Sequence, residues 1–428
     1  MDRREFLGAL GGAAGAMLLP GAAALAREKT AGLPAGADPS STAGDEDFWA
    51  SIRLAFDVDR SIVNLNSGGY SNPPRVVSEA LQRRRSFAAL ARYHYSMHLM
   101  NKNREEVRRK VARLARTDPS QVALVRNTTE AMCLVFYGTG LKRGDQVLAS
   151  SLEYPGMVQA LRQLSARRGV ELVRFRVPLP PKDPAEIVES FRRALGPKVR
   201  MVLVSHMTFP NGQIMPVREI CRLARERGVL SVVDGAHSFA HVGPPVGEIG
   251  CDFYGTSFYK WLCAPMGVGM LWMRKERIPT TWPLFYAEKP RGGDIRKFEH
   301  YGSHSIPAVL GAAEAVSFHE AVGGERKRAR LHYLKKYWTD RVSGIPGLKL
   351  VSNPDPAQTC AMAAFTIRGY KGSEIYSYLW NKHRIVVTPI GPEFSGFDGI
   401  RVSPNIYNTT AELDEFLEAL RRLPPRKS

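Results

Sequence analysis

The sequence has few cysteines, and their placement excludes several kinds of protein. Only five occur in 428 residues, none forms a CxxC pair or a spacing typical of metal ligands, and most lie in apolar runs. Cysteine in such runs behaves as a small buried hydrophobic residue. We therefore expect neither a disulfide framework nor a metal site. No internal repeat is present either, so a repeat architecture is excluded.

Acidic residues are scarce relative to basic ones, with 41 Asp and Glu against 60 Lys and Arg and a formal net charge of +19. Such an excess raises the question of an anionic partner. The basic residues are spread along helix-like segments such as ALQRRRSF and EEVRRKVARLAR, and no nucleic-acid motif accompanies them. We therefore expect no nucleic-acid binding. With 44% hydrophobic residues, the chain is long enough for a globular protein of two domains.

Long apolar runs are missing outside the N-terminus. Residues 1–26 place Arg3 and Arg4 before a Gly/Ala/Leu run that is too short and too weakly apolar for a stable membrane span, and Ala24-Leu25-Ala26 is a small-x-small cleavage pattern. This segment resembles a twin-arginine export signal. We expect export of the folded protein by the Tat translocon, cleavage near Ala26, a periplasmic location and no stable membrane anchor afterwards. An uncleaved apolar anchor is the alternative. Residues 27–46 are typical of a linker.

Strand-like and helix-like segments alternate from residue 47 to residue 305. The strand-like segments are nearly continuous apolar runs, and helix-like segments such as PVREICRLARERG separate them; the strand candidates are QVALVRN, DQVLASS, VELVRFRV, VRMVLVSH, VLSVVDGAH, CDFYGTSF and VGMLWM. This alternation predicts an α/β fold with a mostly parallel sheet flanked by helices. It defines the predicted large domain.

The pattern changes at residue 306. A long basic helical stretch, AVSFHEAVGGERKRARLHYLKKYWTDRV, precedes three strand-like pieces, LKLVS, AMAAFTIRG and RIVVTPI. The last helix begins with a capping box formed by Thr409 and Glu412. Residues 306–428 are therefore predicted to form a smaller C-terminal α+β domain, and the cleft between two such domains is a common ligand site.

One lysine stands out in the stretch TSFYKW. Lys260 lies between Tyr259 and Trp261, with no acidic residue beside it. Loss of hydration lowers the pKa of a lysine toward the range where the neutral amine attacks a carbonyl, which makes Lys260 a candidate nucleophile. The alternative is that its stem packs on the rings while its ammonium group reaches solvent.

Polar residues follow three of the predicted strands, where ligands of a doubly wound sheet bind. RNTTEAM supplies hydroxyls and free amides at a helix start, which suit a phosphate. Asp234 in DGAHS ends an apolar strand and needs a partner if buried. Hydroxyls, an acid and Lys260 together match the needs of pyridoxal 5'-phosphate, whose phosphate, ring nitrogen and aldehyde they would serve.

Seven blocks in order extend this hypothesis to a family. NTTEA, EYPG, SHMTFPNGQIMPV, DGAHS, TSFYKWLCAPMGVG, EHYGSHSIPA and RVSPNIYNT resemble the class V aminotransferases of fold type I, and among them the isopenicillin N epimerase-like group, over about residues 60–425. With its export signal, the chain also resembles the periplasmic pyridoxal phosphate enzymes that tailor pyoverdine-type siderophores. The resemblance implies the fold type I architecture and this cofactor.

The resemblance also implies roles for single residues. Lys260 matches the lysine that forms the Schiff base with the cofactor, and Asp234 matches the partner of its ring nitrogen. His237 matches a residue that bonds the ring hydroxyl, Tyr154 the aromatic residue stacked on the ring, and Arg401 the arginine that grips a substrate carboxylate. The ordinary alternatives are a buried histidine with satisfied hydrogen bonds for His237, loop packing for Tyr154 and a surface ion pair for Arg401.

The phosphate contacts come from hydroxyl residues. The resemblance implies Thr128, Thr129 and Ser257 as ligands within one chain. Ser303 stands where relatives have a threonine that reaches the phosphate of the neighbouring subunit, which implies a homodimer with shared sites. One position departs from the family: many relatives have an Asn beside the cofactor where MTFPN places Thr208 or Phe209.

The reaction is less constrained than the cofactor. Racemisation, transamination, β-elimination and decarboxylation begin alike, with Lys260 free to move a proton. The export signal favours an aminotransferase-type modification of an amino acid or peptide-borne residue in a secreted product such as a siderophore, and epimerase or C–S lyase activity is the alternative. Cysteine desulfurases of this class need a reactive cysteine on a loop of the C-terminal domain. The stretch in that region here, TPIGPEFSGFDGIRVS, has no cysteine, so desulfuration is not expected. A silent binding protein of this fold would be expected to lack Lys260 or Asp234.

Overall fold

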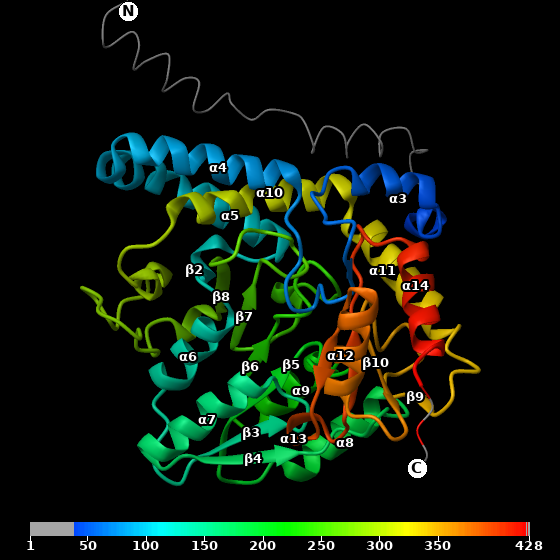
Figure 1. Cartoon of the computed structure of the whole chain (residues 1–428). Helices are drawn as coiled ribbons and strands as arrows, with labels where there is room; N and C mark the ends of the chain where they lie inside the picture. The colour runs from blue at the N-terminus through cyan, green and yellow to red at the C-terminus, as the bar shows by residue number, and fades with distance from the viewer. Residues whose placement is uncertain (1–37, 425, 427–428) are drawn as a thin grey trace, which may run out of the picture.

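The computed structural model describes residues 38–424 and residue 426. A seven-stranded sheet forms its centre (Figure 1). Neighbouring strands are parallel except at β8, which is antiparallel to both of its neighbours. In spatial order the strands are β2 (Val122–Val125), β8 (Gly269–Met273), β7 (Phe253–Ser257), β6 (Leu230–Asp234), β5 (Val199–Ser205), β3 (Gln146–Ser150) and β4 (Glu171–Phe175). The predicted mostly parallel sheet is confirmed.

The strands are buried because helices cover both faces of the sheet. Every residue of β2, β7 and β8 is buried. Connecting helices begin where side chains cap them, as Asn127 does for α6 and Asp183 for α8, and α7 ends at Gly169 in the left-handed conformation. These connectors are α6 (Thr128–Gly138), α7 (Pro155–Arg168), α8 (Pro184–Ala194) and α9 (Val217–Glu226).

A second set of helices lies along one end of the sheet. In Figure 1, α4 (Arg75–Leu90), α5 (Arg104–Leu114) and α10 (Ile306–Val322) run side by side, and α10 packs against both α4 and α5. The N-terminal two thirds of α10 shares one hydrophobic core with β2 and β6. Between α4 and α5 the chain forms a π-helical segment, His94–Met100.

The C-terminal part of the chain surrounds a smaller sheet. Its spatial strand order is β12-β13-β10-β9, with every pair antiparallel. Trp338, Phe365 and Phe416 pack edge to face or tilted in its core. The elements are α11 (Gly324–Thr339), β9 (Leu348–Leu350), β10 (Ala363–Ile367), α12 (Gly372–His383), β11 (Ile385–Val386), β12 (Thr388–Ile390), α13 (Pro392–Ser395), β13 (Gly399–Val402) and α14 (Thr410–Arg421). The predicted smaller α+β unit is present, and the capping box of Thr409 and Glu412 forms as expected.

The basic helical stretch predicted around residues 315–342 is two helices rather than one. The chain breaks at Gly323, whose φ of 87° lies in the left-handed region and ends α10 before α11 begins. The break lets α10 stay on the large sheet while α11 packs against α14. The boundary predicted at residue 306 coincides with the start of α10, a helix that packs on the large sheet.

The first described segments pair with β11 and contact helices of the C-terminal part of the chain. β1 (Val63–Asn64) pairs in parallel with β11. Arg53 at the end of α3 (Glu46–Arg53) bonds Glu412 on α14 at 2.6 Å, and Arg330 on α11 bonds Glu46 at 2.6 Å. This path brings residues 64–70 to the gap between the two sheets. In the described part of the chain, no helix is both long and apolar enough to span a membrane.

Candidate active site

A cavity of about 190 Å³ lies beyond the carboxyl ends of β5, β6 and β7. It is the position at which a doubly wound sheet binds its ligand. Its walls come from the large sheet, from the loop at residues 66–70 and from the small sheet, through Thr388 and Arg401. Eight of the predicted site residues line it: Thr128, Thr129, Tyr154, Asp234, His237, Ser257, Lys260 and Arg401.

Lys260 turns into this cavity three residues after β7 ends. Its Nζ lies 3.4 Å from His237 Nε2. Burial lowers the pKa of Lys260 to about 8, against an opposing effect of the Asp234 carboxylate. Trp261 takes no part in the cavity: it is fully buried and its ring stacks on His241 at 3.9 Å. The alternative of a solvent-directed lysine is therefore wrong, and a usable fraction of its amine is neutral near pH 8.

Asp234 ends β6 at the floor of the cavity and is 4% exposed. Its Oδ1 accepts a hydrogen bond from the Ala236 amide at 2.9 Å. Burial raises the pKa of Asp234, while that amide and Lys260 oppose the rise. The next residue is Gly235, where a Cβ would lie only 1.9 Å from the Tyr254 ring. A cation in the cavity would stabilise the carboxylate.

His237 is the next buried group, and one of its nitrogens has no partner among the described residues. Nδ1 is buried without a hydrogen bond, while Nε2 faces Lys260. Burial holds the pKa of His237 well below its ordinary value, and the nearby charges of Lys260 and Arg401 lower it further. The ring is therefore neutral, with one hydrogen-bonding position to offer to a ligand.

The helix start at α6 forms a polar end of the cavity. The Thr128 amide donates to Ser257 Oγ at 2.9 Å, and the hydroxyls of Thr128 and Ser257 lie 2.8 Å apart. Thr129 is exposed beside them. Two hydroxyls and the start of an 11-residue helix suit an anionic group such as a phosphate.

Two aromatic rings, those of Tyr154 and Phe209, also line the cavity. Tyr154 is 41% exposed at the start of α7, and its ring meets Phe209 edge to face at 5.2 Å. Phe209 in turn lies 6.3 Å from the His237 ring. Thr208 does not line the cavity, because its hydroxyl donates to Asn211 Oδ1 and accepts from the Gln213 amide within its own loop. Of the two residues considered for this position, the one at the cavity is Phe209, which cannot bond a ring hydroxyl.

Arg401 reaches the cavity from β13 with only 1% of its surface exposed. Nη1 donates to the Phe209 carbonyl at 2.9 Å, and Nη2 donates to Asn66 Oδ1 at 3.1 Å and to Thr388 Oγ1 at 3.0 Å. All of these partners are neutral, and Nε is buried without a partner among the described residues. Burial lowers the pKa of Arg401 to about 10. The alternative of a surface ion pair is therefore wrong within the described residues, and the guanidinium is available for a carboxylate.

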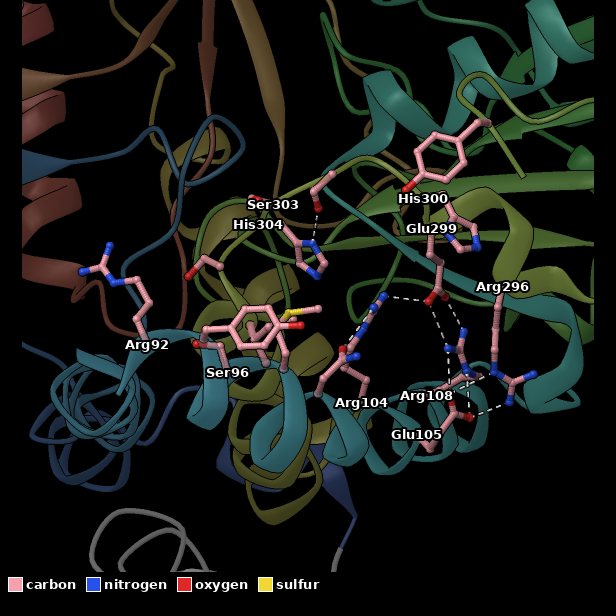
Figure 2. A pocket seen from close by; sticks show the side chains of 17 residues that line it. Arg92, Ser96, Arg104, Glu105, Arg108, Arg296, Glu299, His300, Ser303 and His304 are labelled. Carbon is pink, nitrogen blue, oxygen red and sulfur yellow. Dashed lines mark hydrogen bonds and ion pairs between the residues drawn. The ribbon is translucent and has the colours of Figure 1, made fainter. Parts of the chain in front are cut away.

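Ser303 lies apart from the other predicted site residues. It borders a second cavity, of about 1190 Å³, together with His304 and Arg104 (Figure 2). Figure 2 also shows ion pairs among the residues that line this cavity: Glu299 pairs with Arg104 at 2.6 Å and with Arg108. Exposed apolar side chains flank it, among them Tyr93 at 73% and Tyr286 at 75%.

The sequence interpretation missed several residues at the site. Asn66 and Thr388 hold Arg401, and Tyr70 stacks on Tyr259 at 5.2 Å at the cavity mouth. Glu153, fully buried behind Ser205, was also missed. A signal for Glu153 existed, because it follows the apolar strand β3 as Asp234 ends β6. For Asn66 and Thr388 no sequence signal existed.

The fold and the site together define an enzyme of fold type I that uses pyridoxal phosphate. The model of the family described as Aminotransferase class-V matches residues 62–416, and the chain belongs to this family. Isopenicillin N epimerase of Streptomyces clavuligerus is 31% identical over 396 residues, which cover 88% of this chain and 98% of that protein. The isopenicillin N epimerase of Amycolatopsis lactamdurans is 30% identical over 400 residues, with the same coverage.

A solved structure gives the same architecture. A mutant of C-DES with glycine covalently linked to its pyridoxal phosphate cofactor has a TM-score of 0.75 and 22% identity, covering 86% of this chain and 99% of that chain. Other relatives, at 26% to 30% identity, are named cysteine desulfurases. These relatives support the epimerase or C–S lyase alternative better than the aminotransferase-type modification of a siderophore that the sequence interpretation placed first.

The residues of the cavity fit the cofactor. The free Nδ1 of His237, the buried Asp234 carboxylate and the polar start of α6 are the kinds of group that its ring and phosphate require. Lys260 is placed to hold its aldehyde carbon. A silent binding protein would be expected to lack Lys260 or Asp234. Both residues are present here, and they share one cavity.

None of the five cysteines lines the cavity. Cys263, the nearest to Lys260 in sequence, is buried and accepts a hydrogen bond from Asn405 Nδ2 at 3.6 Å. Burial raises the pKa of its thiol, which disfavours the reactive thiolate. The cavity therefore offers no thiol to receive sulfur from a substrate.

Proposed function

We propose that this protein is an epimerase-type enzyme that removes and returns the α-proton of an amino acid, or of an amino acid residue in a peptide with a free carboxylate. The observation that carries the proposal is that Lys260, with a pKa of about 8, shares one small cavity with Arg401, whose buried guanidinium has neutral partners only. The likeness to two isopenicillin N epimerases over nearly the whole chain supports inversion as the outcome.

Each residue has a separate task. When bound, pyridoxal phosphate withdraws electrons from the α-carbon of an attached amino acid and so eases loss of its proton. Asp234 keeps a proton on the ring nitrogen. Arg401 binds the carboxylate of the substrate through two nitrogens. Lys260 would take the α-proton from one face of the α-carbon, because an amine of pKa near 8 is a usable base at neutral pH. Inversion then requires that a proton be delivered to the opposite face.

The experiment that tests this proposal follows the α-proton. Purified holoprotein is incubated in D₂O with a panel of L-amino acids and short peptides, and NMR and chiral chromatography measure α-deuteration and inversion. Epimerisation predicts α-deuteration with accumulation of the D-form and no keto acid. A keto acid in step with amine transfer would instead establish transamination, and pyruvate with released sulfur would establish C–S cleavage. The proposal would also be contradicted if α-deuteration occurred but no substrate of the panel were inverted.

We propose further that the protein works in the periplasm. The support is the twin-arginine pattern at Arg3 and Arg4, which falls outside the described residues. Translocation in the folded state is compatible with a cofactor acquired before export. The substrate would then be a periplasmic amino acid or peptide, and a peptide of a secreted product such as a siderophore belongs to that class.

We propose finally that the active form is a homodimer. Ser303 borders the second cavity rather than the cavity of Lys260, so within one chain it cannot contact the same phosphate as Thr128. The exposed apolar side chains that line the same cavity, such as Tyr93 and Tyr286, are typical of a surface that a partner covers. A second copy that places its own phosphate site against Ser303 would account for both features.

A further inference from the structure

A buried carboxyl group lies directly behind the cavity wall. Glu153 is 0% exposed and follows β3, the neighbour of β5 in the sheet. Its Oε1 accepts hydrogen bonds from the Ser205 amide at 3.0 Å and from Ser150 Oγ, and its Oε2 accepts from Ser205 Oγ at 2.6 Å. Ser205 itself lines the cavity, and in the sheet it pairs with Asp234. Ser205 therefore stands between Glu153 and the cavity.

The two carboxyl oxygens of Glu153 are not equivalent. Oε1 already receives two donors, one of them a backbone amide that cannot turn away, whereas Oε2 receives only the Ser205 hydroxyl. A proton added to Glu153 is therefore best placed on Oε2, where it replaces the hydroxyl as donor. Ser205 then accepts a hydrogen bond from Glu153, and its own hydroxyl proton is free to turn toward the cavity.

We propose that Glu153 is a positioning residue whose protonation sets, through Ser205, whether the cavity wall beside Asp234 offers a hydrogen-bond acceptor or a donor to the bound cofactor. With Glu153 ionised, the Ser205 proton is held by Oε2 and the wall offers lone pairs. With Glu153 protonated, the wall offers an O–H donor. This role concerns the cofactor site and holds whichever reaction the enzyme performs.

The electrostatic surroundings allow the switch to work near neutral pH. Burial raises the pKa of Glu153 to about 7, against the effect of its three hydrogen bonds, and the nearby charge of Asp234 raises it further. Among the described residues, Arg174 on β4 also interacts electrostatically with Glu153, and its guanidinium donates to the carbonyls of Ser150 and Ser151. Asp234 is favoured as a carboxylate when Glu153 is neutral, because two adjacent buried charges of one sign repel.

The first test is a pH titration of the visible absorption of the bound cofactor. In the wild-type holoprotein we expect an inflection near pH 7, and Glu153→Gln should lose it because the amide cannot ionise. Ser205→Ala should lose it too, because the charge on Glu153 then has no hydroxyl through which to act. Glu314→Gln, which removes a buried carboxylate paired with Arg84 elsewhere, should keep it. Retention of the inflection in Glu153→Gln or Ser205→Ala would overturn the proposal.

The second test does not depend on the cofactor or on a folded variant. Infrared spectra of wild-type apoprotein with ¹³C-labelled glutamate carboxyls should show a protonated carboxylic acid that ionises with a midpoint near pH 7. If no glutamic acid signal titrates in that range, Glu153 carries no proton to exchange and the proposal fails. Where Glu153→Gln folds, its difference spectrum assigns the signal.

Discussion

Lys260 Nζ and His237 Nε2 lie 3.4 Å apart on the floor of the cavity. Because burial holds the pKa of His237 well below its ordinary value, the ring is neutral and accepts a hydrogen bond from the lysine rather than repelling it. This hydrogen bond holds the amine in the cavity that it shares with Asp234. The contact therefore holds a nucleophile of lowered pKa beside a neutral acceptor.

Lys260→Ala should fold but should no longer retain pyridoxal phosphate covalently. Borohydride treatment of the wild type followed by peptide mapping should place a pyridoxyl group on Lys260 alone. Lys297 is the matched internal control: its pKa is also lowered to about 8, but its ammonium donates to the carbonyls of Ile278 and Pro290 outside the cavity. A label on Lys297, or on any other lysine, would refute the assignment.

Asp234→Asn should lower the midpoint pH at which pyridoxal phosphate attaches to Lys260. The neutral amine of Lys260 attacks the cofactor aldehyde, so the attachment rate in wild-type apoprotein should rise with pH and level off above about 8. The Asp234 charge raises the pKa of Lys260, so its removal should lower the midpoint. Stopped-flow absorbance measures it, and α-proton exchange should fall by about 100-fold or more. An unchanged or higher midpoint would contradict this relationship.

Arg401→Lys should raise KM for substrates with an α-carboxylate by about tenfold or more, because a lysine cannot form the two-pronged contact. Asn66→Ala should raise KM less, since Nη2 of Arg401 keeps its contact with Thr388. The corresponding α-carboxamides serve as control substrates. Steady-state kinetics measures both substrate types. An equal loss of turnover with acids and with amides would contradict a role in carboxylate binding.

Mixed dimers should regain activity that neither parent has. Ser303→Asp places a negative charge where the partner's phosphate is proposed to bind, and Lys260→Ala removes the nucleophile. If sites are shared, refolding the two variants together restores one intact site in each heterodimer, or about a quarter of wild-type activity at statistical mixing. Light scattering confirms the oligomeric state. Failure to complement, or a fully active monomer, would argue against shared sites.

Replacement of Arg3 and Arg4 by Lys should leave the protein in the cytoplasm with its cofactor bound, because twin-arginine signals are read by their arginine pair. Cell fractionation and immunoblotting measure the distribution, and N-terminal sequencing of the wild type should begin near Arg27. A variant with only Arg3 replaced by Lys is the graded control. Periplasmic accumulation of the double variant would mean that another route is used.

Much of the fold and of the reactive centre was predictable because the signals are local. Apolar strands alternating with capped helices predicted the sheet, and the residues that follow the strands predicted Asp234, Lys260 and the hydroxyls of Thr128 and Ser257. In a parallel sheet these carboxyl ends meet along one edge, so sequence position already implies proximity. Glu153, which follows β3, obeys the same rule.

Other features were decided by the tertiary structure. Asn66 and Arg401 lie 335 positions apart and meet because Asn66 forms a β-bridge with Ser403, just after β13. Whether Trp261 or Lys260 entered the cavity could not be read from TSFYKW, since neighbouring side chains diverge and packing selects one: Trp261 stacks on His241, which leaves the cavity to Lys260. The local sequence determined which groups were available, and long-range packing decided which of them meet.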